Sequence, residues 1–253
     1  MNGFVVFARK ELREILHTWR IWVLPSILLF FAVMGPLLAK FTPEIVRAVA
    51  RNQFNGLEIP TPTYLDAYAQ WIGNLSQIAL FALIIIYGGI ISSESKSGTA
   101  ILVLTKPISR TTFVIAKVVV HSIFLAILVV LGTFITWGLT LAIFAEAPGS
   151  ALWSSALVWL VFGILFIALM TLLSVLIRSS AGAAGAGLGV YALLSMAAIW
   201  KPLGTYSPAA ITGQATSLAA GKAVAWQWSV LTSLLLAALI ISLAAVMFRR
   251  KEL

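Results

Sequence analysis

Long apolar runs dominate the chain, and short polar segments separate them. Six runs contain no Asp, Glu, Lys or Arg. A membrane-crossing helix needs about 20 apolar residues to span roughly 30 Å of hydrocarbon. Each run can therefore hold one such helix, and none is long enough for two. The pattern predicts spans near residues 21–39, 72–92, 118–144, 152–177, 181–200 and 226–248.

Polar residues mark the boundaries between these predicted spans. Glu146, Pro148 and Gly149 form a short turn between the third and fourth spans. Arg178 and Ser179 separate the fourth from the fifth. The longest polar segments are residues 40–70, 94–117 and 201–222, and none is long enough for a soluble domain. Residues 1–253 are thus expected to form one transmembrane domain.

Composition supports a lipid-facing exterior. Hydrophobic residues make up 61% of the chain and charged residues 10%, against about 25% charged in soluble domains. Mean hydropathy is +1.03. The apolar runs are continuous and lack the alternation of transmembrane β-strands. The predicted fold class is an all-α integral membrane protein with six transmembrane helices.

Lys and Arg set the expected orientation, because they accumulate in cytoplasmic loops. With the N-terminus in the cytosol, twelve of the seventeen basic residues lie inside, and both termini are cytosolic. Trp residues fall near the predicted membrane boundaries, as in an aromatic belt; they are Trp19 and Trp22 inside, and Trp71, Trp153, Trp200, Trp226 and Trp228 outside. The pattern predicts a multi-pass protein of a prokaryotic cell membrane.

The net charge of +9 does not indicate a nucleic-acid partner. The basic residues lie between apolar runs, where anionic lipid headgroups account for them. The chain has no cysteine and only two histidines, His17 and His121. It carries no metalloprotease or serine-hydrolase motif. No catalytic residue, metal site or cofactor is therefore expected in this chain.

Residues 1–20 predict an amphipathic interfacial helix. Phe4, Leu12 and Leu16 share one face of residues 4–19 with Ala8, Ile15 and Trp19, and Glu11 falls at the margin. The opposite face is basic, with Arg9, Lys10 and Arg13 among its residues. Such a helix is expected to lie in the membrane plane with its cations toward anionic lipid. It is either a simple anchor or a cytosolic platform that transmits force from a partner into the first span.

The inner segment 94–117 is polar, then apolar for one to two turns, then polar again around a proline. Gly98 can end the preceding helix in the left-handed conformation, and Pro107 restricts the residue before it. Thr99 through Leu104 can form a short apolar element, followed by Lys106 and Arg110. This element suits a socket on another protein. An ordinary positive loop is the alternative.

These residues resemble a known family. A Glu at the end of the second span, a Gly-Thr pair, a Leu-rich stretch and Pro-x-x-Arg resemble the permease subunits of type-2 ABC exporters, especially those associated with multicopper-enzyme maturation. The resemblance covers nearly the whole chain. It implies a homodimer coupled to separate ATPase subunits, which would hold ATP and Mg²⁺. It also implies an ATPase-coupling role for Glu94, Gly98, Thr99, Leu104, Pro107 and Arg110.

The fifth predicted span opens with a run of small residues. Gly185 and Gly189 form a small-xxx-small pair, and Gly182 pairs with Ala186, which lets another helix approach closely. Packing within one protomer and a dimer interface both fit this pattern. Since Leu188 stands where a P-loop needs Lys, a nucleotide loop is excluded.

The outer segments are less specific. Residues 201–222 can form a short helix at 209–218, which is either a re-entrant or interfacial helix that caps the translocation route or part of an ordinary exposed loop. Residues 43–54 can form a surface helix.

Uncharged polar residues within the spans are the candidate cavity lining, notably Asn74, Gln77, Thr133 and Thr136. They favour a lipid-like, amphipathic or peptidic substrate over a small ion. Ion-driven carriers usually keep ionisable groups within the membrane, and the acidic residues here lie near span ends. The preferred function is an ABC exporter permease; the alternatives are an ion-driven or passive carrier and a non-transporting scaffold or sensor.

Overall fold

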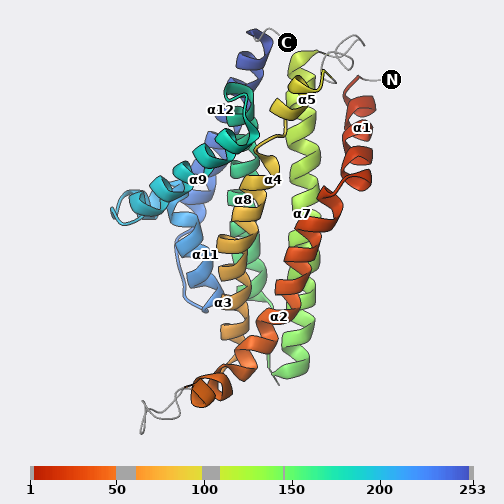
Figure 1. Cartoon of the computed structure of the whole chain (residues 1–253). Coiled ribbons are helices and arrows are strands. Elements are labelled where there is room, and N and C mark those ends of the chain that lie inside the picture. The colour runs from red at the N-terminus through yellow and green to blue at the C-terminus, as the bar shows by residue number, and fades with distance from the viewer. Residues whose placement is uncertain (1–2, 50–60, 99–108, 145, 251–253) are drawn as a thin grey trace.

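A computed structural model describes residues 3–49, 61–98, 109–144 and 146–250. Within these ranges the chain is helical and contains no strand. Six segments are long and apolar enough to cross a membrane: Arg20–Ala48, Tyr64–Lys96, Arg110–Ile143, Ser150–Leu176, Ser180–Ala197 and Gln227–Arg250. The all-α, six-span class is therefore confirmed. Both termini lie at one end of the bundle (Figure 1), as an even number of spans requires, and their cytosolic location stays a prediction.

Figure 1 shows the helices of the described residues in their arrangement. They are α1 (Gly3–His17), α2 (Arg20–Val49), α3 (Tyr64–Asn74), the π-helical turn η1 (Leu75–Ala79), α4 (Leu80–Tyr87), α5 (Ser92–Lys96), α7 (Arg110–Ile143), α8 (Ser150–Leu176), α9 (Ser180–Ala197), α10 (Leu203–Tyr206), the 3-10 turn η2 (Pro208–Ala210), α11 (Ile211–Ala219) and α12 (Gln227–Arg250). The second span is thus built from α3, η1, α4 and α5 together.

Helix α8 is the centre of the bundle. It packs against α7, α11 and α12, and also against α4 and α9. Its apolar residues point in all directions, which is typical of a buried helix. Phe162, Phe166 and Met170 are almost fully enclosed. The other spans are consequently arranged around α8.

The second span is interrupted at residues 88–91, between α4 and α5. A Cβ built on Gly88 would lie 2.5 Å from the carbonyl oxygen of Ser180, so only glycine allows this approach to α9. The freed N–H groups of Ile91 and Ser92 donate to Ser174 Oγ on α8, at 3.0 and 2.9 Å. The interruption is therefore satisfied by hydrogen bonds, and it places α5 at the end of the bundle where the termini lie.

Helix α2 continues beyond the predicted first span. Pro25, Pro36 and Pro43 all lie inside it, although each removes a backbone donor and usually kinks a helix. The predicted surface helix at 43–54 is instead, as far as residue 49, the continuation of α2. Figure 1 shows this last part bending away from the bundle.

Residues 201–222 are not an ordinary exposed loop. Ile211, Ala215 and Ala219 of α11 are fully buried, and α11 packs on α8 and α3. Gln214 fixes the turn because its amide nitrogen donates to the carbonyls of Thr205 and Ala225. The predicted helix at 209–218 is close to α11, and its packing against α8 and α3 argues against an ordinary exposed loop.

The interfacial position of Trp71 was predicted wrongly. Its side chain is fully buried, and its indole Nε1 donates to Thr133 Oγ1 at 3.1 Å. By contrast, Trp19, Trp22, Trp200 and Trp228 are well exposed, as an aromatic belt requires. Trp71 packs instead against Gly132 of α7, where no side chain stands in its way.

Two glycines of α7 provide a matched test of this packing. A Cβ at Gly132 would lie 2.5 Å from the Trp71 ring, whereas one at Gly138 would meet nothing within 4 Å. We expect Gly132→Ala to lower stability by about 1–3 kcal/mol through overpacking. Gly138→Ala should be neutral or stabilising by about 1 kcal/mol, because alanine favours a helix. Thermal unfolding in detergent measures both, and equal midpoints would contradict the close contact.

Candidate functional site

Helix α1 is attached to the bundle by a face that includes a carboxylate. Phe7, Glu11 and Ile15 are almost completely buried, and α1 contacts α7. The predicted apolar face is divided: Ile15 is buried, whereas Leu12 and Leu16 are each about half exposed. Figure 1 shows α1 running mainly along α7, which differs from the predicted in-plane orientation. The reason is that the face containing Glu11 packs on protein.

Lys117 of α7 is the centre of a buried ion-pair cluster. Its Nζ lies 2.9 Å from Glu11 Oε2 and 2.9 Å from Glu94 Oε1. The side chains of Lys117 and Glu11 have no exposed surface, and that of Glu94 is 9% exposed. One ammonium thus joins α1, α5 and α7.

Lys10 makes a second bridge at the rim of the same cluster. Its Nζ contacts Glu11 at 2.9 Å, Glu14 at 2.6 Å and Glu94 at 3.0 Å. Glu14 also pairs with Arg20 at the start of α2, at 3.3 Å. We refer to Lys10, Glu11, Glu14, Arg20, Glu94 and Lys117 as the inner ionic cluster. Its three cations balance its three carboxylates.

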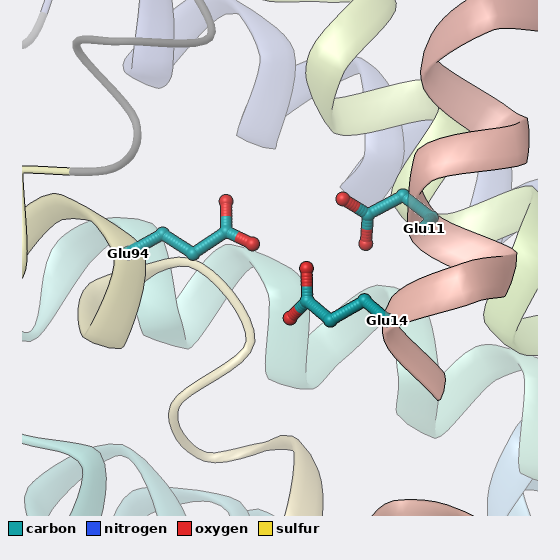
Figure 2. A group of neighbouring side chains, drawn as sticks. All are labelled: Glu11, Glu14 and Glu94. Atoms are coloured by element: carbon teal, nitrogen blue, oxygen red, sulfur yellow. The ribbon is translucent and has the colours of Figure 1, made fainter. Parts of the chain in front are cut away.

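The three carboxylates converge from two sides. Figure 2 shows Glu11 and Glu14 projecting from α1 toward Glu94, and one oxygen of each lies within 4.8 Å of the others. Carboxylates at this spacing suit a hard cation. Here Lys10, Arg20 and Lys117 already neutralise them, so the donor set fits an ionic joint better than a metal site.

Aromatic rings close the cluster from water. Phe7 and Phe113 lie 4.9 Å apart, and Phe113 stacks on Phe248 of α12 at 5.2 Å. Lys117 Nζ lies 5.2 Å from the centre of the Phe113 ring, within cation–π range. His121 borders the cluster, with Nε2 3.8 Å from Glu11 Oε2. Among the described residues, neither ring nitrogen of His121 has a hydrogen-bond partner.

The environment shifts the pKa values of the α1 side chains. Burial favours the neutral form of Glu11, but contact with His121 and the charges of Lys117 and Lys10 outweigh it, so its pKa falls well below the usual range. The pKa of Glu14 is also lowered: burial opposes the shift, and its hydrogen bond from Lys10 and the charge of Lys117 drive it. Burial lowers the pKa of Lys10, but the charges of Glu11 and Glu94 raise it above its usual range.

The structure positions part of the predicted ATPase-coupling segment. Glu94 lies in the inner ionic cluster rather than facing a partner. Gly98 has φ +71°, the predicted left-handed conformation. Arg110 Nη1 donates to the carbonyls of Phe248 and Arg249 at the end of α12, at 3.3 and 3.2 Å. Thr99, Leu104 and Pro107 lie outside the described residues.

The basic residues predicted on the first helix divide into two groups. Arg9 and Arg13 are exposed, and the side chain of Trp19 is also largely exposed. Lys10 instead belongs to the inner ionic cluster. Sequence reasoning missed Glu11 as a buried residue and placed Lys117 in a cytosolic loop. The sequence does contain a signal for each residue. Glu11 is an acidic residue among basic ones, and Lys117 is a single basic residue between apolar ones.

The glycines of α9 have different surroundings. Nothing lies within 4 Å of a Cβ built on Gly185 or Gly189, whereas Gly187 contacts Met170 and Ile84. Gly182 lies near only Ile177 and Ser179. Packing within the protomer thus uses Gly187, and the faces of Gly185 and Gly189 remain open.

The four residues predicted to line a cavity divide into two pairs. Asn74 and Gln77 line a groove between α2 and α3. Thr133 and Thr136 are fully buried; Thr133 accepts from Trp71, and Thr136 donates to the Ala32 carbonyl at 3.2 Å. Neither threonine lines a cavity in this structure. They satisfy polar groups between tightly packed helices.

The central lysine gives a direct test of the inner ionic cluster. Lys117→Met leaves buried carboxylates without their shared ammonium, and removing one partner of a buried pair costs about 3–5 kcal/mol. Arg13→Met is the matched control, because Arg13 is an exposed cation, and should change stability by less than about 0.5 kcal/mol. Thermal unfolding in detergent distinguishes them. Indistinguishable midpoints would show that Lys117 does not hold the cluster together.

The lowered carboxyl pKa values also predict an acid dependence of stability. Glu11 and Glu14 bind protons more readily when unfolded. Their contribution is therefore complete above the ordinary Glu pKa of about 4.3 and is lost as the pH falls toward their folded values. The thermal midpoint should be insensitive to these groups near pH 7 and drop below about pH 4. The double variant Glu11→Gln/Lys117→Met should show a shallower drop, and an unchanged slope would contradict the assignment.

Comparisons with known proteins agree with this architecture. Residues 5–253 match the family described as "ABC-2 family transporter protein". The "Probable ABC transporter permease protein NosY" of Stutzerimonas stutzeri is 31% identical over 206 residues, covering 76% of this chain and 67% of that protein. NosY of Pseudomonas aeruginosa is 32% identical over 73% of this chain and 64% of its own length. The "Uncharacterized transmembrane protein YxlG" of Bacillus subtilis is 24% identical, covering 100% of this chain and 99% of YxlG. The chain belongs to the ABC-2 transporter family and is a multi-pass permease of the prokaryotic cell membrane.

Proposed function

We propose that this permease is the membrane subunit of an ATP-driven exporter and works as a homodimer with two separate ATPase subunits. The observation that carries the proposal is the inner ionic cluster at the start of the coupling segment. Glu94 lies four residues before Gly98, where the helix ends. Force applied to the segment that follows would reach α1 and α7 through the ion pairs of Glu94.

Arg110 supports coupling at the other end of this segment. It is the first residue of α7, and it donates to two carbonyls at the end of α12. Cations at a helix C-terminus satisfy free carbonyls and interact favourably with the helix dipole. The segment between Gly98 and Arg110 thus begins on a joint with α1 and ends on a joint with α12. Movement of a docked ATPase would act on both.

The open face of α9 supports a second copy as partner. Gly185 and Gly189 have no neighbour within 4 Å of a built Cβ, and small residues allow close helix approach in membranes. Only 17% of the α9 span is buried within the protomer, against 67% for α8. A symmetric contact through α9 would enclose this surface.

The surroundings of the ionisable groups in α7 favour ATP-driven transport over a proton-driven carrier. Lys117 and His121 are ionisable groups within α7, which a proton-driven carrier would need. However, Lys117 is held by two carboxylates and has the geometry of a fixed joint. The proposal therefore keeps the energy source in the ATPase partner.

Gentle purification tests the proposal directly. When the chain is extracted from its native membrane in mild detergent, an ABC-type ATPase should co-purify in equal amount and hydrolyse ATP. Cross-linking should also detect two copies of the permease in the complex. If no ATPase is recovered, and ATP changes nothing in the purified protein, the proposal fails.

Two variants address the coupling segment. Glu94→Ala and Arg110→Ala should each reduce the ATPase recovered per permease, or its stimulation by the permease, while membrane insertion is unchanged. Arg178→Ala is the control, since Arg178 is an exposed arginine in the connection between α8 and α9. Full ATPase recovery and stimulation with both variants would remove the coupling role of these residues.

A further inference from the structure

A groove that contains a row of polar side chains lies between α2 and α3, in the half of the bundle remote from the termini (Figure 1). Its volume is about 550 Å³, within the range of small-molecule sites. On the α3 side it is lined by Asp66, Gln70, Asn74 and Gln77. The facing wall of α2 contributes Ala39, Thr42 and Pro43. We call this the α2–α3 groove.

The four polar side chains form a row. Their spacings of four, four and three residues place them on one face of a helix. At 1.5 Å per residue, the row from Asp66 to Gln77 is roughly 16 Å long. It runs into the π-helical turn η1, which includes Gln77, and π-helical turns are frequent at functional sites. The row is therefore long enough for an extended molecule and too long for one ion.

The amides of this row are available for a ligand. Among the described residues, the side chains of Gln70, Asn74 and Gln77 make no hydrogen bond, and Gln70 and Gln77 are exposed. Gln214 is different: its amide donates to two carbonyls, and its oxygen accepts from Ser229. The protein thus satisfies an amide where the role is structural. Wherever protein or lipid covers these amides, leaving them unpaired costs free energy, so they need water or a ligand as a partner.

The residues that line the groove favour an uncharged, amide-bearing ligand over an anion. Among the residues that the structure describes, Asp66 is the only charged one that lines the groove, and its Oδ2 already accepts from the Thr63 N–H at 2.7 Å. Lys40 and Arg47 also lie on α2, but neither lines the groove. Within this described lining, an anion would meet the Asp66 carboxylate and no cation. Side-chain amides both donate and accept, so their natural complement is another amide.

We propose that the α2–α3 groove is a water-filled ligand site for an elongated, uncharged, amide-bearing solute, such as a short peptide segment. Its role as part of the translocation route rests on the proposed function. Its existence does not, because the unpartnered amides need water or a ligand whatever drives transport. The sequence favours a peptidic or amphipathic substrate in general terms, and this proposal adds the place where such a substrate binds.

The absence of native cysteine allows a clean accessibility test. Single variants Gln77→Cys and Ile78→Cys are compared in the intact complex in proteoliposomes. The reagent is a membrane-impermeant trimethylammonium-ethyl methanethiosulfonate, which reacts with thiolate. Ile78 is the matched control, because it is 40% exposed and adjacent to Gln77 but does not line the groove. We expect Gln77→Cys to react at least roughly tenfold faster, since only a thiol in water ionises readily.

Equal rates at the two positions would overturn the proposal. So would a Gln77→Cys thiol that is inert to the reagent but forms a disulfide with a second copy, because the groove would then be a dry dimer contact. An Asn74→Cys variant provides a second position in the row. It must react like Gln77→Cys for the proposal to stand.

The ligand class is tested by protection. N-acetyl-trialanine amide should slow the modification of Gln77→Cys severalfold, whereas N-acetyl-trialanine with a free carboxylate should protect much less. Equal protection by the two peptides, or none by the amide, would overturn the assigned chemistry. ATPase recovery is measured in the same preparations. A reactive, protected groove without ATPase would contradict only the proposed function, and a co-purified ATPase with an inert groove would contradict only this inference.

Discussion

A buried ammonium needs a counter-charge, and in this protein Lys117 obtains it from two helices distant in sequence. Glu11 lies on α1 and Glu94 on α5, and both contact the same Nζ at 2.9 Å. Since an unpaired charge in such a site is strongly destabilising, α1, α5 and α7 are held in one arrangement. The direction of α1 along α7 follows from this requirement. So does the interruption at residues 88–91, which directs α5 into the cluster.

The two ends of the bundle treat polar groups in opposite ways. At the end with the termini, each cluster carboxylate has an ionic partner, and Phe7 and Phe113 exclude water around Lys117. At the remote end, Gln70, Asn74 and Gln77 present hydrogen-bonding capacity that the described residues leave unused. One end of the bundle thus has a rigid ionic joint, and the other has an open groove with polar side chains. This arrangement fits a transporter that receives force at the first end and binds solute at the second.

The spans could be predicted from sequence because the requirement for about 20 apolar residues is local. The left-handed conformation of Gly98 could be predicted for the same reason. Glu11 and Lys117 could not, because their pairing joins residues 106 positions apart, and the helical pattern placed one at a margin and the other in a loop. Trp71 was expected at the membrane boundary because Trp is common there, and Thr133 in a cavity lining because it is an uncharged polar residue within a span. Their mutual hydrogen bond depends on Gly132, whose missing side chain makes the space.

The pairing of Glu11 with Lys117 also orders events during synthesis. The carboxylate leaves the ribosome 106 residues before its ammonium partner, which at bacterial elongation rates is a delay of roughly 5–20 s. During that time Glu11 has Lys10 beside it but lacks the buried ammonium of Lys117, while the exposed face with Leu12 and Leu16 can rest on the lipid surface. The in-plane orientation that the sequence favours is compatible with this interval. Docking of α1 as in the structure requires α7 to be in place, because Lys117 lies on α7.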